Sequence, residues 1–449
     1  MATPPLTADP ARNSVAGFSA DLAPVFSGAP ARRATLWLLV ALLPLFGQTF
    51  HYISDIKPLW ALSKAFPLLS LPAAFWLARE ERFPMALQVV LGFGWLVLAP
   101  SFASVVYFHE SFFTSITAQV KLLPMLYFFS FLAVLLAAKP TLAELERGFV
   151  ILGAAVTVTL IVFWAVVPNS WYQGTYVSGQ APFFSADNRG HRIRMSMYFP
   201  IIVLFLCYRR AYFERSLRYL LGAAVAFAVT LLIVKTRAMV IGITGVLVLN
   251  TLLWSRPLVR LGLLLCAPFG LAAMFSAGYL ATTFSTGADT GFDTRRISIE
   301  IATRFLGSDP LRWIFGVGTI SPTSHDSLID YFHHFFFLAD ITWLGIVFEY
   351  GLIGALIILF FQLRGLHFYR RLRAQVDDDF LGSLFDYLVY ILLISVFYPP
   401  TLTPGETAVI LAIFAYVWRA GRLHDAHEPQ FAAQPRFQPR SADAPLEAH

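Results

Sequence analysis

Along most of its length the sequence consists of apolar runs long enough to cross a lipid bilayer. A helix needs about 20 apolar residues to span the hydrocarbon core, with a range of roughly 17–25. Twelve runs approach or reach that length, and charged or turn-forming residues separate them. We therefore expect an all-α fold, a polytopic membrane helical bundle of about 12 transmembrane helices. The runs lie near residues 35–52, 59–78, 84–107, 120–138, 148–167, 195–208, 219–235, 238–254, 261–281, 337–363, 384–398 and 406–418.

The composition argues against a soluble protein. Only 13% of the 449 residues are charged and 57% are hydrophobic, whereas soluble domains are about 25% charged and about 45–50% apolar. We expect no nucleic-acid partner, because the net charge of +6 is not gathered into a basic stripe outside short loops. Cys207 and Cys266 lie inside apolar runs, which is typical of small core or lipid-facing residues and not of a disulfide or zinc framework.

The basic residues predict an orientation for these helices, because Lys and Arg collect in the short cytoplasmic loops of membrane proteins. If the N-terminus is cytoplasmic, every predicted inner loop carries at least two basic residues. We therefore expect both termini in the cytoplasm. A transmembrane domain over residues 35–424 would then lie between two disordered tails, residues 1–34 and 425–449, whose composition cannot bury a core. The predicted inner loops are 79–83, 139–147, 209–218, 255–260 and 364–383.

Two outer segments, about 168–194 and about 282–336, are long enough to carry function, and we expect short helices within them. Both contain arginines, against the usual charge bias. A single outer arginine often reaches to lipid phosphates, and that interpretation stays open for each one alone. The group fits an anionic ligand in the bilayer, such as a lipid-linked diphosphate, because guanidinium binds phosphate oxygens through paired hydrogen bonds. The outer basic residues are Arg189, Arg192, Arg194, Lys235, Arg237, Arg295, Arg296, Arg304 and Arg312.

Candidate acids and bases lie where the second outer segment enters the tenth apolar run. His333 and His334 stand at its edge, Asp340 lies about one turn inside it, and Glu349 is about 13 Å deeper at 1.5 Å per residue. Such groups can act as acids or bases. An interfacial polar pair for the histidines and an arginine partner for Asp340 remain open, and a structural role is favoured for Glu349. We expect no metal and no cofactor, because adjacent histidines diverge on a helix and cannot easily share an ion.

Two pairs of glycines predict close backbone approach. Gly316 and Gly318 lie two residues apart in WIFGVGTIS, without the third glycine and the strand-to-helix setting of a nucleotide-binding fingerprint. Gly351 and Gly354 follow in the tenth run, where we expect them to let helices pack closely.

Several of these features occur in one order along the chain. They are RGHRIRMS (189–196), KTRAM (235–239), RRISIEIATRFLGSDPLRWIFGVG (295–318) and His334 followed by Leu338 and Gly345. In this order the chain resembles the O-antigen ligase/polymerase superfamily over roughly residues 180–365. The ligases of that family carry a histidine with a leucine four positions later and a glycine eleven positions later. Phe335 departs from the family pattern, which has Asn, Ser or Gln there.

The resemblance implies a metal-independent glycosyltransferase of the bacterial inner membrane. Its donor is a glycan on undecaprenyl diphosphate at the periplasmic face. A ligase that joins the glycan to lipid A-core is expected first, and a polymerase of the same superfamily next. A flippase or transporter for lipid-linked oligosaccharide is the alternative from a different class.

The implied partners are the lipid-linked donor, a lipid-core or glycan acceptor and membrane lipids, with room for a chain-length regulator. Arginines would stabilise the departing diphosphate, and a base would take the proton of the attacking hydroxyl. The expected diphosphate-binding residues are Arg192, Arg194, Arg237 and Arg296, with Arg189 in support, and the expected bases are, in order, His334, His333 and Asp340.

Overall fold

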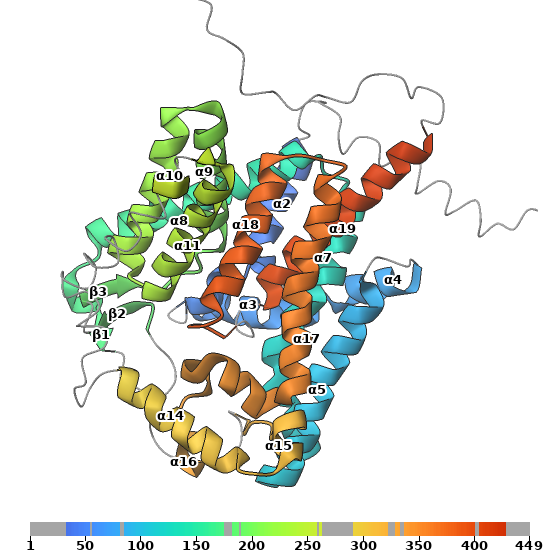
Figure 1. Cartoon of the computed structure of the whole chain (residues 1–449), viewed down its shortest axis with the longest axis vertical. Helices are drawn as coiled ribbons and strands as arrows, with labels where there is room; N and C mark the ends of the chain where they lie inside the picture. Colours follow the sequence, from blue (N-terminus) through green and yellow to red (C-terminus); the bar gives the residue numbers. More distant parts are fainter. Residues whose placement is uncertain are drawn as a thin grey trace, which may run out of the picture.

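The computed structural model describes most of the chain as helices, with one small sheet (Figure 1). This confirms the all-α class and the helical-bundle architecture. The described residues are 33–53, 56–80, 85–174, 182–187, 190–257, 260–262, 291–321, 328–332, 336–399 and 404–427.

The helices follow one another with short connections. Those before the sheet are α2 (Arg33–Phe46), η2 (Thr49–Tyr52), α3 (Lys57–Leu69), α4 (Leu71–Glu80), α5 (Ala86–Phe108), α6 (Phe112–Ala118), η3 (Gln119–Leu126), α7 (Tyr127–Ala138), α8 (Leu142–Val166) and η4 (Asn169–Trp171). Those after it are α9 (Tyr198–Glu214), α10 (Leu217–Val229), η5 (Thr230–Val234), α11 (Arg237–Trp254), α14 (Gly291–Leu306), α15 (Pro310–Phe315), α16 (Leu328–Tyr331), η6 (Leu338–Ile341), α17 (Thr342–Arg373), α18 (Asp379–Ile394) and α19 (Pro404–His427).

Within the described residues, six segments are long and apolar enough to cross a membrane. They are Ala86–Phe108, Phe112–Ala138, Leu142–Val166, Leu217–Val234, Arg237–Trp254 and Leu338–Arg373. Large apolar side chains on their surface are exposed, among them Leu87, Leu91 and Val106 on α5, as expected of a surface that faces lipid. Every predicted run overlaps a described helix except 261–281, which lies almost wholly outside the described residues. The total of about 12 spans and their orientation stay predictions.

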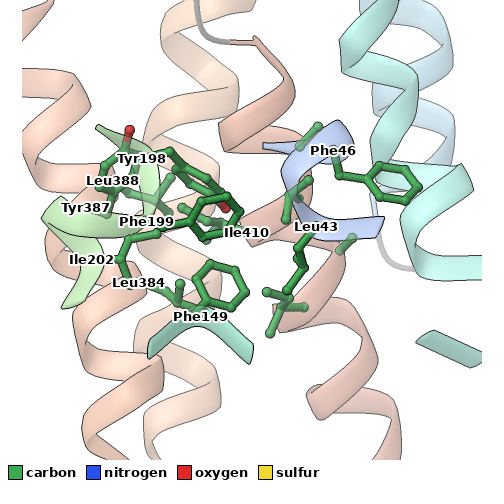
Figure 2. Close-up of a cluster of buried hydrophobic side chains, with 14 of the residues drawn as sticks. Leu43, Phe46, Phe149, Tyr198, Phe199, Ile202, Leu384, Tyr387, Leu388 and Ile410 are labelled. Carbon is green, nitrogen blue, oxygen red and sulfur yellow. The ribbon is translucent and has the colours of Figure 1, made fainter. Parts of the chain in front are cut away.

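Helix α19 lies in the centre of the bundle, beside α7, α17 and α18. All of its residues from Ala408 to Val417 are buried, and a helix that is apolar all round belongs in the interior. Aromatic side chains join α8, α9 and α18 nearby (Figure 2). Phe149 meets Phe199 and Tyr198 meets Tyr387 edge to face, each with ring centroids 5.2 Å apart. Such contacts add to the stabilisation from burial alone and fix α9 between its neighbours.

The sheet lies in the first outer segment, where we expected short helices. Strand β1 (Gln173–Gly174) is parallel to β2 (Phe184–Asp187), which is antiparallel to β3 (Gly190–Ile193). The extended conformation fits the alternation of polar and apolar residues in HRIRM. Gly190 begins β3 with a φ of +79°, a conformation open to glycine. In Figure 1 the sheet and α14–α16 lie toward one end of the bundle, and the α9–α10 turn lies toward the other.

Helix α17 is broken at Gly351, whose φ is +69°. The segment that contains Gly316 and Gly318 lies against this break, where Val317 N–H donates to Phe348 O at 2.8 Å and Gly318 N–H to Glu349 O at 3.2 Å. A Cβ on Gly316 would lie 2.5 Å from the backbone nitrogen of Gly351. The predicted close approach at Gly316 and Gly318 is therefore confirmed. Gly351, expected to help two helices pack, instead interrupts its own helix.

Candidate functional site

Arg192 and Arg194 extend from the same side of the β3 segment. Successive side chains alternate along a strand, so residues two apart share a side. Ser185 pairs with Arg192 across the strands, and Arg194 Nε donates to Ser185 Oγ at 2.8 Å. Arg192 is buried and Arg194 half-buried. Both arginines lie on extended backbone, and α9 begins only at Tyr198.

The turn between α10 and α11 carries Lys235 and Arg237, as predicted. Lys235 caps the π-helix η5. It has a left-handed φ of 53° and donates its N–H to Thr230 O at 3.0 Å. Arg237 is the first residue of α11. A Cβ on Gly190 would lie 3.5 Å from Lys235 Nζ, so this turn lies against β3. The structure thus brings together two basic segments that are about 40 positions apart in the sequence.

A cavity of about 40 Å³ opens beside these two basic segments. That space holds a few water molecules at about 10–15 Å³ each. Both basic segments contribute to its wall, the first through residues that follow Arg194 and the second through residues on either side of Arg237. Helices α18 and α19 form the remaining wall. The lining includes Ser196, Tyr198, Thr236, Tyr387, Tyr398 and Glu406.

Glu406, in the first turn of α19, places a carboxylate in this wall. Its residue is 7% exposed, and Tyr387 Oη donates to its Oε2 at 2.6 Å. Tyr198, 1% exposed, lines the same cavity, and its hydroxyl has no hydrogen-bond partner among the described residues. Buried polar groups are normally hydrogen-bonded. The cavity therefore combines a buried carboxylate with hydrogen-bonding capacity that the protein leaves unused.

The site residues predicted from the sequence did not include Glu406. The available signal was a carboxylate at the start of the last apolar run, in TPGETAVIL, since carboxylates within membrane helices are candidates for function. Its place at the first position of the predicted run 406–418 made it resemble a residue of the preceding loop.

The structure separates the other predicted site residues from this cavity or does not describe them. Arg296 is exposed on α14, a helix that packs on η6 and α17. Asp340 is half-buried in η6, and Arg295 acts on it electrostatically, which favours the open interpretation of Asp340 as an arginine's partner. Arg189, His333 and His334 lie outside the described residues, so their roles stay predictions.

Glu349 has the structural role that the sequence analysis favoured. Lys121 Nζ donates to both of its carboxylate oxygens, at 2.7 and 2.8 Å, and the Gln119 amide donates at 3.2 Å. Gln119 in turn accepts a hydrogen bond from Tyr350 Oη at 3.0 Å. A buried carboxylate with a cation and an amide donor is well satisfied. Its position beside Gly351 indicates that it stabilises the break in α17.

Aromatic residues cover the outer side of the sheet. The Tyr172 ring stacks on the His191 imidazole with centroids 4.4 Å apart, and Phe184 packs against both Trp171 and Tyr172. Burial raises the pKa of Tyr172 above its ordinary value, so its phenol stays neutral at physiological pH. These contacts hold β2 and β3, and with them Arg192 and Arg194, in place.

The fold and this site define a helical membrane protein in which two segments that carry basic residues contribute other residues to the wall of a cavity with a buried carboxylate. Among the described residues, no three His, Cys, Asp or Glu side chains gather as a metal site would require. No protein-family model matches the chain, and no curated protein matches it.

Proposed function

We propose that this protein is a membrane glycosyltransferase that takes a glycan from a polyprenyl diphosphate donor, undecaprenyl diphosphate in bacteria. The observation that carries the proposal is the meeting of β3 and the Lys235–Arg237 turn beside a cavity within the bundle. The two segments that lie against each other there carry Arg192 and Arg194 on one side and Lys235 and Arg237 on the other.

This arrangement suits the departure of a diphosphate. As the bond to the sugar breaks, negative charge grows on the leaving oxygen, and preorganised cations stabilise it more in the transition state than in the ground state. Arg237 adds a second effect because it begins α11, where the helix dipole and backbone N–H groups favour an anion. Arginine also offers paired donors that match phosphate geometry. No metal is required if these groups neutralise the diphosphate.

The acceptor hydroxyl must lose a proton as it attacks. His334, then His333, then Asp340 are the proposed bases. Asp340 stays third, because it lies on η6, which packs against α14 and α17 and not beside the cavity.

The reaction we propose first is ligation of the glycan to lipid A-core on the periplasmic side of the inner membrane, with both termini cytoplasmic. A polymerase of the same superfamily differs chiefly in its acceptor, and a chain-length regulator would be its natural partner. The domain over residues 35–424 would carry the activity in either case.

One observation favours a second class of protein, a flippase for lipid-linked oligosaccharide. Transporters build their sites from interrupted helices near the centre of the bilayer, and α17 is interrupted at Gly351 beside the Lys121–Glu349 ion pair. We rank it second because the cavity and the basic segments lie together elsewhere, on α9, α11, α18 and α19.

The test is to express the protein in parallel in a ligase-null and a polymerase-null strain and to examine surface polysaccharide on gels. Substitution to alanine of Arg192, Arg237, Arg296 or His334 is expected to reduce glycan transfer roughly 100-fold or more, as loss of a transition-state donor does elsewhere. Arg304→Ala is the matched control, because Arg304 is exposed and paired with Glu300 at 2.8 Å.

Restoration of one strain distinguishes ligase from polymerase. Near-normal transfer in the Arg192 and Arg237 variants would exclude their proposed roles. Lipid-linked glycan that accumulates on the cytoplasmic side of the membrane in the gene's absence would instead identify a flippase.

A further inference from the structure

The cavity beside the basic segments has a composition that selects its ligand. The described residues on its wall include hydroxyl groups, aromatic rings and one carboxyl group, and no arginine or lysine is among them. A buried carboxyl group disfavours an anionic phosphate, whereas it and the phenols can hydrogen-bond a neutral hydroxyl. The ligand of the cavity is therefore chemically different from the ligand of the basic segments.

The hydrogen-bonding groups in the wall are incompletely used. A carboxylate offers about four lone-pair positions, and among the described residues Glu406 receives one hydrogen bond, from Tyr387. The Tyr198 hydroxyl is fully buried without a partner, although it lies close enough to Glu406 to interact with it electrostatically. A hydroxyl group in the cavity could donate to Glu406 and accept from Tyr198 at once.

The position of the cavity indicates which hydroxyl enters. Ser196 on its wall is two residues beyond Arg194, and Thr236 immediately precedes Arg237. A diphosphate bound by these arginines would present its first sugar to the cavity. The volume of about 40 Å³ suits a hydroxyl or hydroxymethyl arm of that sugar and not the whole ring, since each water-sized group takes about 10–15 Å³.

We propose that this cavity is a sugar subsite in which Glu406 and Tyr198 bind a hydroxyl of the donor sugar that is attached to the diphosphate. Tyr387 holds the Glu406 carboxylate in position by its hydrogen bond. The subsite rests on the proposed glycosyl transfer and deepens it, because it lets the protein recognise the sugar independently of the lipid carrier.

The experiment compares two probes on the purified full-length protein in lipid nanodiscs. The first is undecaprenyl diphosphate without sugar, and the second is the lipid-linked glycan extracted from a host strain that lacks the gene. Glu406→Gln replaces one carboxyl oxygen by an amide NH₂ group, and Tyr198→Phe removes the hydroxyl that has no partner among the described residues. Tyr416→Phe is the matched control. Tyr416 lies on α19 and is buried like Tyr198, but its hydroxyl donates to Pro140 O at 2.9 Å and it does not line the cavity.

Glu406→Gln is expected to weaken binding of the lipid-linked glycan roughly three- to tenfold, as loss of a hydrogen bond does. Tyr198→Phe is expected to weaken it roughly three- to tenfold, as loss of a neutral hydrogen bond does. Neither variant changes the affinity for the carrier without sugar, and Tyr416→Phe changes neither affinity. Tyr198→Phe keeps the test valid if Glu406→Gln folds poorly.

Each contrary result has a distinct meaning. Wild-type affinity for the glycan in both variants would overturn the subsite while leaving the proposed function intact. Failure of the wild-type protein to bind either probe or to complement either strain would overturn the proposed function itself.

Discussion

Glu349 and Glu406 are two buried carboxylates of similar exposure, 5% and 7%, in very different surroundings. Glu349 receives hydrogen bonds from the Lys121 ammonium and the Gln119 amide, next to the break in α17. Glu406 receives one from the Tyr387 phenol and lines a cavity. Removing a carboxylate from water is costly unless it is paired and hydrogen-bonded.

The difference shows how a buried glutamate that stabilises the fold can be distinguished from one that can bind a ligand. Around Glu349 the protein supplies its own partners, so the site is complete without a ligand. Among the described residues, Glu406 receives a single hydrogen bond, and Tyr198 adds a buried hydroxyl for which they supply no partner. A site that the protein leaves incomplete is one that a ligand can complete. Four predictions test this comparison.

The largest effect is expected at the break beside Glu349. In Gly351→Ala the new Cβ would meet the backbone of Phe315 and Gly316, at a φ of +69° that disfavours any side chain. Strain and overpacking together should lower the free energy of unfolding by about 3–5 kcal/mol. Thermal unfolding in detergent measures the change. A midpoint within a few degrees of wild type would mean that the break is adaptable and that this region is not rigid support.

Lys121→Met should destabilise by about 3 kcal/mol, because it leaves the Glu349 carboxylate buried without its cation. We expect the low end of the usual range, since the Lys121 side chain is 37% exposed. The double variant Lys121→Met/Glu349→Gln is the control, and its unfolding midpoint should recover most of the loss. If the double variant is no better than the single one, the ion pair is not what stabilises this region.

Tyr198→Phe should act in the opposite direction on stability. It removes a buried hydroxyl that has no partner, so the folded state is expected to gain up to about 1 kcal/mol even though glycan binding weakens. The unfolding midpoint of Tyr198→Phe should rise, whereas that of Tyr416→Phe should fall because this variant loses the hydrogen bond to Pro140 O. A destabilised Tyr198→Phe would show that the hydroxyl is already satisfied, and the contrast with Glu349 would disappear.

The smallest effect is expected for Arg304→Ala on α14. Its ion pair with Glu300 joins residues that are 78% and 64% exposed, and exposed pairs at this helical spacing contribute about 0.3–0.5 kcal/mol. The unfolding midpoint and glycan transfer should both stay close to wild type. A clear loss of transfer would mean that the surface of α14 contributes beyond the role proposed for Arg296.

The sequence allowed the fold class and two local features to be predicted. Apolar runs of membrane length predicted a helical bundle because backbone polar groups in lipid must be satisfied within helices. The basic turn at Lys235–Arg237 followed from its place between two such runs. Close approach at Gly316 and Gly318 followed from the absence of side chains.

The remaining features depend on contacts between distant parts of the chain. The sheet was missed because a four-residue strand such as β3 is too short for a periodic signal, and aromatic packing from Tyr172 stabilises it. The meeting of β3 with η5, and of Tyr198 with Glu406, joins segments that are far apart in sequence. Periodicity describes one element at a time and therefore could not show the cavity that these segments enclose.

The pairing of residues 316–318 with the break in α17 has a consequence for membrane insertion. The carbonyl oxygens of Phe348 and Glu349 accept hydrogen bonds from Val317 and Gly318. The next residue, Thr319, is tied to α5, because the Ser104 hydroxyl donates to its carbonyl oxygen and accepts from its N–H. An unpaired carbonyl is costly in lipid, so α17 cannot reach its final form before this upstream segment arrives. The segment and the helix must therefore assemble as one cooperative unit. A chimaera that exchanges the segment between proteins would have to exchange residues 348–351 with it.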